Sequence, residues 1–526
     1  MESVIIVGSG PASAGCVAGL LENGGNTITV LDIGAGLPDA TREIARRIRE
    51  VTPDKWPHDL RLALYPTSHQ AANSSLPEKL VLGSDYPFVD HGQMTDITWT
   101  DGEHPNVISG AMGGFSNVWG GQAYPFSSWA LRNWPERGRK MPGAYTAIRR
   151  LLPIAGLEDS LLEFLPSYGL LSELPPLAIR TQRILKAFSR RREELAGLGI
   201  HAGAARVAID VQRCIKCGLC NGGCAWDLIF SSRQLFKRWI AEKKITYVPE
   251  IVVKSVKETA SGVEVHTISL NRERRSFTAD RVFLAAGAVG TSKIVLNSFP
   301  ELNDLEMKEC RQMIVPLVFP RSARTPEEGD TFALGQAGIY FAPLTSHEAF
   351  LQLYPYDPSF VSGLPRIVRQ HPALRNTLLR HLAIGLLYFN SEQSPTIRLR
   401  AVKTSSNEVG IELSGKMFSK GESSVRETFS RLGAAGKHAG FRPVIPLTKV
   451  TPAGRSYHWG GQFGYEENPK SQTSSDRLGR LSAWHNIHIV DASTFPTLGP
   501  TGFLLTVMAN AYRIARETAY EEAPSD

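Results

Sequence analysis

The sequence contains no uninterrupted apolar stretch long enough to cross a bilayer, no low-complexity tract and no internal repeat. It also lacks a basic, hydrophobic and cleavable leader ahead of its first apolar run, Val4–Val7. With 42% hydrophobic and 21% charged residues, the composition excludes a disordered chain. We therefore expect a cytoplasmic globular protein without a membrane span, and its 526 residues predict two packed domains.

Motifs for nucleic-acid binding are absent as well. The net charge is +7, yet neither helix-turn-helix spacing nor an aromatic-rich RNA-binding motif accompanies it. Part of the positive excess lies in Arg180, Arg183, Lys186, Arg190, Arg191 and Arg192. Such a run is typical of a solvated helix face, and the alternative is a docking patch for an acidic electron acceptor or an anionic substrate.

The beginning of the chain has the pattern of a dinucleotide-binding β-α-β unit. The buried run at 4–7 leads into glycines at 8 and 10, a small-residue helix follows, and a second apolar run at 28–31 ends in an acid. The first glycine permits a tight turn, the second lets backbone approach a pyrophosphate, and the acid accepts from a ribose hydroxyl. The residues expected to contact the dinucleotide are Gly8, Gly10, Pro11, Ala12, Ser13 and Asp32.

The third glycine of this pattern is missing. Ser13 takes its place, where close packing of helix on strand requires only a small residue. The pattern alone leaves open whether the dinucleotide is NAD or FAD.

The other end of the chain suggests which cofactor is bound. Residues 455–461 read Arg-Ser-Tyr-His-Trp-Gly-Gly, residues 486–497 form a strand followed by a turn, and an apolar helix extends to 516. Glycine-rich segments at 113–121 and 284–291 and a Trp-Pro pair at 134–135 accompany them. In these segments the sequence resembles the glucose-methanol-choline family of FAD oxidoreductases. The resemblance spans nearly the whole chain, and only about 300–450 matches loosely.

This resemblance implies a set of FAD-binding residues. Two segments also support it by themselves, because small residues at 285–288 and an acid at 491 each end an apolar run, where α/β sheets bind ligands; tight packing is the alternative for the small residues. Val118 stands where some sugar oxidases of the family carry a flavin-linking histidine, so the FAD is expected to be non-covalent. The small-residue run places Ala286 and Gly287 near the cofactor. The resemblance implies that Val253 contacts the adenine of FAD and that Asp491 and Ala492 lie near its pyrophosphate or ribityl chain. It also implies that FAD is cradled by Gly113, Gly114, Ser116 and Asn117.

The chemistry implied by the resemblance needs a base. Hydride transfer from an alcohol carbon to flavin N5 leaves a carbonyl once the hydroxyl proton is removed, and histidine suits that task near neutral pH. His458 matches the catalytic histidine of the family; the alternative is a surface or core histidine. The family usually carries a second catalytic His or Asn, where this chain has Gly502. Thr501, a water or a middle-domain residue must then hold the substrate oxygen, and there is room for a bulkier substrate.

Four of the six cysteines form a C-x2-C-x2-C-x3-C run, Cys214, Cys217, Cys220 and Cys224. This spacing is typical of an iron-sulfur site, [4Fe-4S] with four ligands or [3Fe-4S] with three; three plus Cys310 is a further arrangement. Zinc and a metal-free loop are the alternatives, and Cys16 is expected in the core. Some sugar dehydrogenases of the family carry a comparable loop, which implies transfer of electrons from flavin to an external acceptor or small redox protein.

These features combine into one organisation. We expect an α/β fold, α+β overall, with a Rossmann-like FAD-binding domain at 1–300 and 451–526 that carries the cysteine loop at 208–232. Residues 301–450 are expected to form a substrate domain on an antiparallel sheet, in which 396–400 and 408–413 look like paired strands.

Three functions fit this organisation. The first is an FAD alcohol dehydrogenase or oxidase acting on a sugar, a glycoside or an aminoglycoside-like polyol, a substrate class that rests on the resemblance. The second is a flavin and iron-sulfur electron-transfer protein without alcohol chemistry, and the third is a non-redox dinucleotide-binding protein. Reduction of bound flavin by a panel of polyols separates the first from the others.

Overall fold

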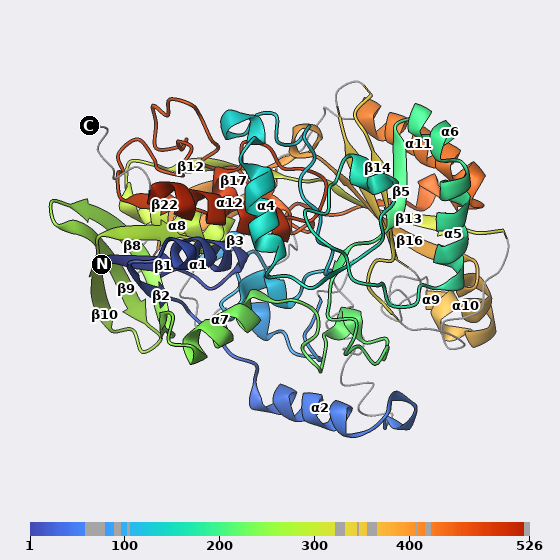
Figure 1. Ribbon diagram of the computed structural model, residues 1–526, viewed down its shortest axis with the longest axis horizontal. Helices are drawn as coiled ribbons and strands as arrows, with labels where there is room; N and C mark the ends of the chain where they lie inside the picture. Colours follow the sequence, from blue (N-terminus) through green and yellow to red (C-terminus); the bar gives the residue numbers. More distant parts are fainter. Residues whose placement is uncertain are drawn as a thin grey trace.

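The computed structural model describes residues 1–57, 79–88, 96–101, 106–320, 332–344, 347–354, 366–404, 409–415 and 422–519. Figure 1 shows a parallel sheet with helices packed on it at one end of the molecule and a large antiparallel sheet at the other. In the part of the chain so described, no helix is both long and apolar enough to traverse a membrane.

A five-stranded parallel sheet collects strands from both ends and the middle of the chain. Its order is β22-β11-β1-β2-β7, with β1 at Glu2–Val7, β2 at Asn26–Leu31, β7 at Thr246–Val248, β11 at Arg281–Leu284 and β22 at Ile487–Ile489. Each neighbouring pair is parallel. Strands buried on both faces read as continuous apolar runs, which is why β1 could be predicted. The expected Rossmann-like sheet is confirmed.

Two separate cores cover the faces of this sheet. Val4 and Ile6 of β1 enter the core beneath helices α1 (Pro11–Asn23) and α12 (Leu504–Thr518), whereas Ile5 and Val7 enter the core beneath α8 (Ala288–Ser298). The alternation follows from the two-residue period of a strand. An antiparallel sheet of β8 (Ile251–Thr259), β9 (Gly262–Ser269) and β10 (Arg274–Ala279) lies on the α8 side.

Helices α1 and α12 approach so closely that glycine is required at their contact. A Cβ at Gly15 would overlap the carbonyl oxygen of Met508, and one at Gly19 would lie 2.8 Å from the carbonyl oxygen of Tyr512. The first and last helices of the chain are thereby held against each other over the parallel sheet (Figure 1).

The strand pair expected at 396–413 exists within a third sheet. Strands β17 (Thr396–Lys403) and β18 (Val409–Gly415) pair antiparallel, while residue 408 lies outside the described part. Their sheet has the order β21-β12-β17-β18-β3, with β21 at Trp459–Gly460, β12 at Asp304–Glu309 and β3 at Ile97–Trp99. This sheet joins the middle of the chain to β21, which follows His458 directly.

A seven-stranded sheet forms the other end of the molecule. Six strands follow the order β19-β13-β16-β15-β14-β5, at Arg442–Pro443, Gln312–Val318, Leu382–Phe389, Ala349–Tyr354, Ala337–Phe341 and Ile200–Ala204. The seventh, β20 (Lys449–Val450), pairs with β13. Strand β5 comes from the first 300 residues, so the second sheet is not built from 301–450 alone. The division into two domains stays a prediction.

The basic run lies on helices α5 (Ile179–Arg190) and α6 (Arg192–Gly197), which cover the large sheet together with α11 (Glu422–Ala439). Helix α5 buries Thr181, Ile184 and Phe188 on one face and carries its charges on the others. The guanidinium of Arg180 donates to the carbonyl oxygens of Arg380 and Leu382. This amphipathic pattern is that of a solvated helix face.

The remaining described elements connect these sheets. Their bounds are α2 Asp39–Glu50, α4 Met141–Arg149, α7 Ser232–Ala241, α9 Arg366–Gln370, α10 Pro372–Leu379, β4 Ile154–Ala155 and β6 Val207–Ala208.

Candidate active site

The turn after β1 opens onto free space. Gly8 has φ 98°, and a Cβ there would lie 2.7 Å from the carbonyl oxygen of Ala285, so only glycine fits the turn. Apart from Gly10 and its chain neighbours, none of the described residues has a heavy atom within 4 Å of the position that a Cβ of Gly10 would take. Helix α1 begins at Pro11 without a side-chain cap, which leaves the N–H groups of its first turn available. The turn therefore suits the close approach of a pyrophosphate.

Asp32 stands at the end of β2, and two protein hydroxyls already contact it. Ser9 Oγ and Tyr247 Oη both donate to its Oδ2, the latter over 2.8 Å. Burial raises the pKa of Asp32 to about 6, although these hydrogen bonds lower it. Tyr247 comes from β7, which pairs with β2, and no pattern in the sequence pointed to it.

The predicted glycine-rich segment at 113–117 meets the first turn directly. Gly113 has φ 92°, and its N–H donates to Ser9 Oγ over 2.9 Å. The position that a Cβ of Gly114 would take is 3.5 Å from the Cα of Gly10. Ser232, at the start of α7, clamps both segments, because its hydroxyl lies 3.0 Å from the carbonyl oxygen of Ser9 and 3.1 Å from that of Gly113. The structure thus brings together two segments that lie 100 residues apart.

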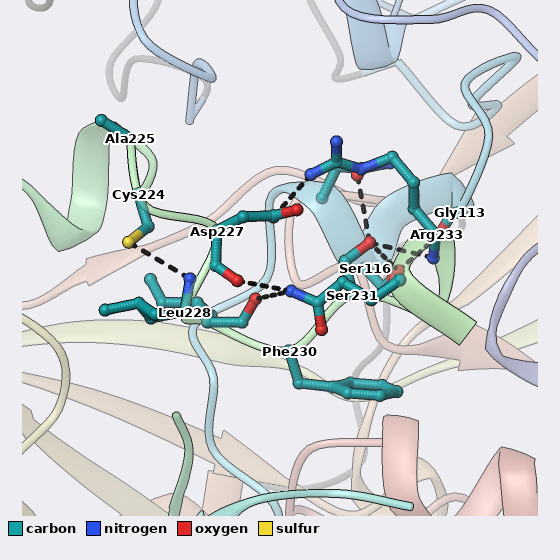
Figure 2. Close-up of polar contacts among 12 residues, drawn as sticks. Gly113, Ser116, Cys224, Ala225, Asp227, Leu228, Phe230, Ser231 and Arg233 are labelled. Atoms are coloured by element: carbon teal, nitrogen blue, oxygen red, sulfur yellow. Dashed lines mark hydrogen bonds and ion pairs between the residues drawn. The ribbon is translucent and has the colours of Figure 1, made fainter. Parts of the chain in front are cut away.

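Ser116 and Asn117 hold the shape of this segment. Ser116 Oγ lies 3.0 Å from Ser231 Oγ and accepts from the N–H of Ser232 (Figure 2). The Asn117 amide donates to the carbonyl oxygens of Met112 and Gly114 over 3.0 and 2.8 Å. Because both side chains form hydrogen bonds with protein groups, their contribution to the site is to fix the conformation of the 113–117 turn.

Asp491 ties a third segment to the start of α8. Its carboxylate accepts from Thr291 Oγ1 and from the N–H of Ser493 over 2.9 Å, and the N–H of Gly287 also lowers its pKa. Burial has the larger effect and raises that pKa. Gly287 has φ 78° and no heavy atom within 4 Å of its missing Cβ. Ala286 keeps accessible surface beside it, so this helix start is open as well.

Val253 lies in β8 with a buried side chain. Two residues earlier on that strand, the N–H of Ile251 donates to the backbone carbonyl oxygen of Asp32 over 3.0 Å. Val253, a predicted cofactor contact, therefore lies on the strand that passes Asp32.

Two aromatic rings pack against His458. The Phe503 ring stacks on the imidazole at 4.7 Å between centroids, and the Tyr388 ring lies at 4.8 Å. Among the described residues none forms a hydrogen bond with the covered Nδ1, while the side chain as a whole keeps some accessible surface. Burial lowers the pKa of His458 to about 4. The imidazole is therefore neutral at pH 7 and able to accept a proton.

The residues that flank His458 hold it against the dinucleotide segments. The rings of Tyr457 and Trp459 lie 5.5 and 6.1 Å from that of Phe115, between centroids. A Cβ at Gly460 would overlap the carbonyl oxygen of Ala492, which accepts from the N–H of Gly461 over 2.9 Å.

Further bonds fix the backbone of His458 itself. Tyr457 has φ 54°, a left-handed conformation that only surrounding contacts maintain. Cys310 donates its N–H to the carbonyl oxygen of His458 over 2.9 Å, and Ser456 Oγ accepts from the N–H of His458 over 3.1 Å. Gln462 donates to the carbonyl oxygen of Ala288, at the start of α8, over 3.1 Å. The predicted base is thus anchored to three dinucleotide-site segments.

Position 502 is closed to any side chain. A Cβ there would lie 2.9 Å from the carbonyl oxygen of Gln122. Thr501 is 1% exposed, and its hydroxyl donates to the carbonyl oxygen of Pro125 over 3.3 Å. The substitution of Thr501 for a second catalytic side chain stays a prediction, and its hydroxyl is already bonded to protein. Sequence reasoning missed Tyr388, Phe503 and Gln122, which no motif marks.

The cysteine loop does not show the expected metal site. Within the described residues, no three or more His, Cys, Asp and Glu side chains are grouped so as to hold a metal ion. Burial raises the pKa of Cys217 to about 11 and that of Cys220 to about 12, and the neighbouring Cys214 and Cys224 thiols raise the former further. The iron-sulfur cluster and its zinc alternative are therefore unsupported.

Cys310 lies apart from the loop. It belongs to the core beneath α1 and α12, and its thiol donates to the carbonyl oxygen of Gly499 over 3.2 Å. The loop cysteines lie in two other cores, so the arrangement of three loop ligands plus Cys310 is wrong. Cys16 is in the core as expected.

The cysteine loop nevertheless contacts the dinucleotide site. Figure 2 shows the carboxylate of Asp227 paired with Arg233, 2.7 Å apart, and the N–H of Leu228 donating to Cys224 Sγ over 3.4 Å. The backbone of Arg233 in turn packs on Gly113. One ion pair therefore connects the loop with the glycine-rich segment.

Comparison with known proteins supports the fold. No protein-family model matches the sequence, and no curated protein does. A pyridoxine 4-oxidase from Mesorbium loti matches in structure with a TM-score of 0.60, at 14% identity and over 99% of both chains. A formate oxidase from Aspergillus oryzae RIB40, studied for its FAD modification, matches with a TM-score of 0.62, at 12% identity and over 99% of this chain and 98% of the other. At such identities the likeness establishes a shared fold.

Proposed function

We propose that this chain is an FAD-dependent oxidoreductase of the glucose-methanol-choline type, which oxidises a CH–OH group to a carbonyl with His458 as the base. One observation carries the proposal. An imidazole with a free Nδ1 among the described residues is anchored by its neighbours to Phe115, Ala288 and Ala492, one residue from each of three dinucleotide-site segments. The fold shared with two oxidases supports it.

The residues present fit FAD. Open space at Gly10 and the uncapped start of α1 suit the pyrophosphate, and Asp32 suits a ribose hydroxyl. The open start of α8 at Gly287 offers a second approach for the cofactor. Val118 provides no nucleophile, so binding is non-covalent. When bound, FAD supplies the acceptor for the substrate hydride.

His458 takes the substrate hydroxyl proton. Its pKa of about 4 keeps the imidazole unprotonated across the physiological range, as a base requires. The rings of Phe503 and Tyr388 pack on the imidazole and restrict its orientation. The Ser456 hydroxyl and the N–H of Cys310 fix the backbone on either side. These groups orient the base before the substrate arrives.

The substrate proposed is a small polar alcohol. The resemblance favours a sugar, a glycoside or an aminoglycoside-like polyol, with oxygen or an external electron acceptor as the oxidant. The aromatic rings of Phe503 and Tyr388 also offer packing for a ring alcohol, and pyridoxine, named for one structural neighbour, belongs in the test.

Reduction of the bound flavin tests this function. The purified chain supplied with FAD should be yellow, and its flavin absorbance should bleach without oxygen when the right alcohol is added. The panel consists of glucose, methyl glucoside, sorbitol, an aminoglycoside, pyridoxine and formate. A colourless chain would refute cofactor binding, whereas a yellow chain that no alcohol bleaches would favour a non-redox dinucleotide-binding protein.

A second proposal concerns electron transfer through the cysteine loop. The Asp227–Arg233 ion pair joins this loop to Gly113. Burial raises the pKa of the Cys224 thiol, while the N–H groups of Leu228, Trp226 and Ile229 lower it, as N–H groups do in sites that stabilise sulfur anions. Protein purified without oxygen should contain about three or four iron atoms and matching sulfide per chain.

The variant Cys217→Ser should lose this metal and Cys310→Ala should keep it. Zinc in place of iron would exclude electron transfer by the loop. A metal-free protein would reject the proposal.

A further inference from the structure

Gln122 carries a buried amide that the protein does not satisfy. The residue is 3% exposed, and neither Nε2 nor Oε1 has a hydrogen-bond partner among the described residues. The assignment of the two atoms does not matter here, since both are unpaired. A buried amide without partners is costly, so a group absent from the chain is its natural partner.

The backbone of Gln122 is fixed against Gly502. Pairing with β6 holds it, because Ala208 donates its N–H to the carbonyl oxygen of Gly121 over 2.7 Å and Ala123 donates to Arg206 over 2.9 Å. The carbonyl oxygen of Gln122 occupies the space that a side chain at Gly502 would need. The next residue, Phe503, stacks on His458. Gln122 therefore lies one residue from a direct contact of the base.

The side chain of Gln122 points toward Gly335 and Tyr354. Its amide nitrogen and the ring carbon Cζ of Tyr354 both face Gly335. Burial raises the pKa of Tyr388, the charge of Tyr354 adds to this effect, and the Tyr388 ring lies 4.8 Å from that of His458. The unpaired amide thus faces Tyr354, while the backbone of Gln122 lies against Gly502, the neighbour of Phe503.

We propose that the Gln122 amide binds the substrate, donating to one hydroxyl and accepting from a neighbouring one, while His458 takes the proton of the reacting group. The inference rests on the proposed function and adds a specificity. An amide that must be paired at both ends favours a vicinal diol or polyol over an alcohol with a single hydroxyl. Gln122 would then hold a substrate oxygen, which Gly502 cannot do because it has no side chain.

Gln336 provides a matched control. It is 1% exposed, its Oε1 accepts from the N–H of Ala178 over 2.9 Å, and its Nε2 donates to the carbonyl oxygen of Phe332 over 2.8 Å. Replacing Gln336 by methionine leaves two backbone groups without a hydrogen bond and should lower the stability. Replacing Gln122 by methionine removes the desolvation cost of an unpaired amide. The two glutamines therefore separate a structural from a binding role.

The test compares Gln122→Met with Gln336→Met in thermal unfolding without substrate and in anaerobic flavin reduction by sorbitol and by 1-butanol. Gln122→Met should keep its FAD and its melting temperature, and its KM for sorbitol should rise about 10- to 100-fold with little change for 1-butanol. Gln336→Met should melt at least about 2 °C lower with an unchanged KM.

Other outcomes overturn the proposal. A melting temperature that falls in Gln122→Met as in Gln336→Met makes the amide structural, and an unchanged KM for sorbitol removes the binding role. Failure of the proposed function looks different, because the unsubstituted protein would then show no flavin reduction by any alcohol of the panel. In that case the role of Gln122 falls with it.

Discussion

Replacement of His458 by alanine should slow reduction of the bound flavin by the substrate about 100- to 10,000-fold, the usual contribution of a positioned base. The imidazole is neutral, and no described residue forms a hydrogen bond with its Nδ1, so the variant loses the proposed proton acceptor. Stopped-flow absorbance without oxygen measures the rate. FAD content should stay near that of the parent, because the segments that would hold the cofactor are formed by other residues.

His488 is the control for this experiment. It is also buried, but its Nδ1 bonds to the carbonyl oxygen of Leu478 over 3.0 Å and its ring stacks on Phe283. His488→Asn should lower the melting temperature and leave the rate of flavin reduction within a few-fold. If His458→Ala reduces its flavin as fast as the parent, the mechanism proposed here is wrong.

The pH dependence of the parent follows from the same burial. Because the pKa of His458 is lowered to about 4, the neutral base is present at neutral pH and is lost only as the pH falls toward that value. The value of kcat/KM should therefore stay level from pH 8 to about 5 and drop below. A drop centred near pH 6.5 would show an imidazole that water reaches freely.

The second large effect is expected from Gly460→Ala. The added methyl group would overlap the backbone carbonyl oxygen of Ala492, and two backbone segments cannot rotate apart as side chains do. Relief requires β21 to move away from the Asp491–Ala492 turn, at a cost of about 1–3 kcal/mol or more. The variant should lose most of its FAD and unfold at a lower temperature, which absorbance and calorimetry measure.

Gly433→Ala is the matched control. Gly433 lies in α11, and no heavy atom comes within 4 Å of its missing Cβ. Alanine there should stabilise the protein by about 0.5–1 kcal/mol, because it restricts the unfolded chain. Parental FAD content and stability in Gly460→Ala would show that β21 does not need this close contact.

Local patterns were enough to predict the strands and the turn that form the proposed dinucleotide site. The run at 4–7 is apolar because β1 is covered on both faces, and Gly8 and Gly10 are spaced by the turn itself. Asp32 follows β2 for the same local reason. These features depend on neighbours within one β-α-β unit, so their spacing is visible in the sequence.

Contacts between distant segments could not be predicted in this way. Tyr247 reaches Asp32 from β7, and Ser232 reaches Ser9 from α7, in each case over more than 200 residues of chain. Tyr388 lies in the middle region at about 300–450, where no motif was recognised, yet its ring packs against His458. The cysteine spacing predicted a metal site, but the described side chains are not grouped so as to hold a metal ion. Spacing along the chain carries no information on where side chains point.

The order of strands in the parallel sheet has a consequence for synthesis. Strands β1 and β2 leave the ribosome first, but β22 and α12, which cover the edge of β11 and the glycine face of α1, emerge last. At about 5–20 residues per second, the roughly 450 residues between β2 and β22 take on the order of 20–90 s to translate. During that time the apolar face of α1 and the edge of β11 lack the two elements that cover them in the folded chain.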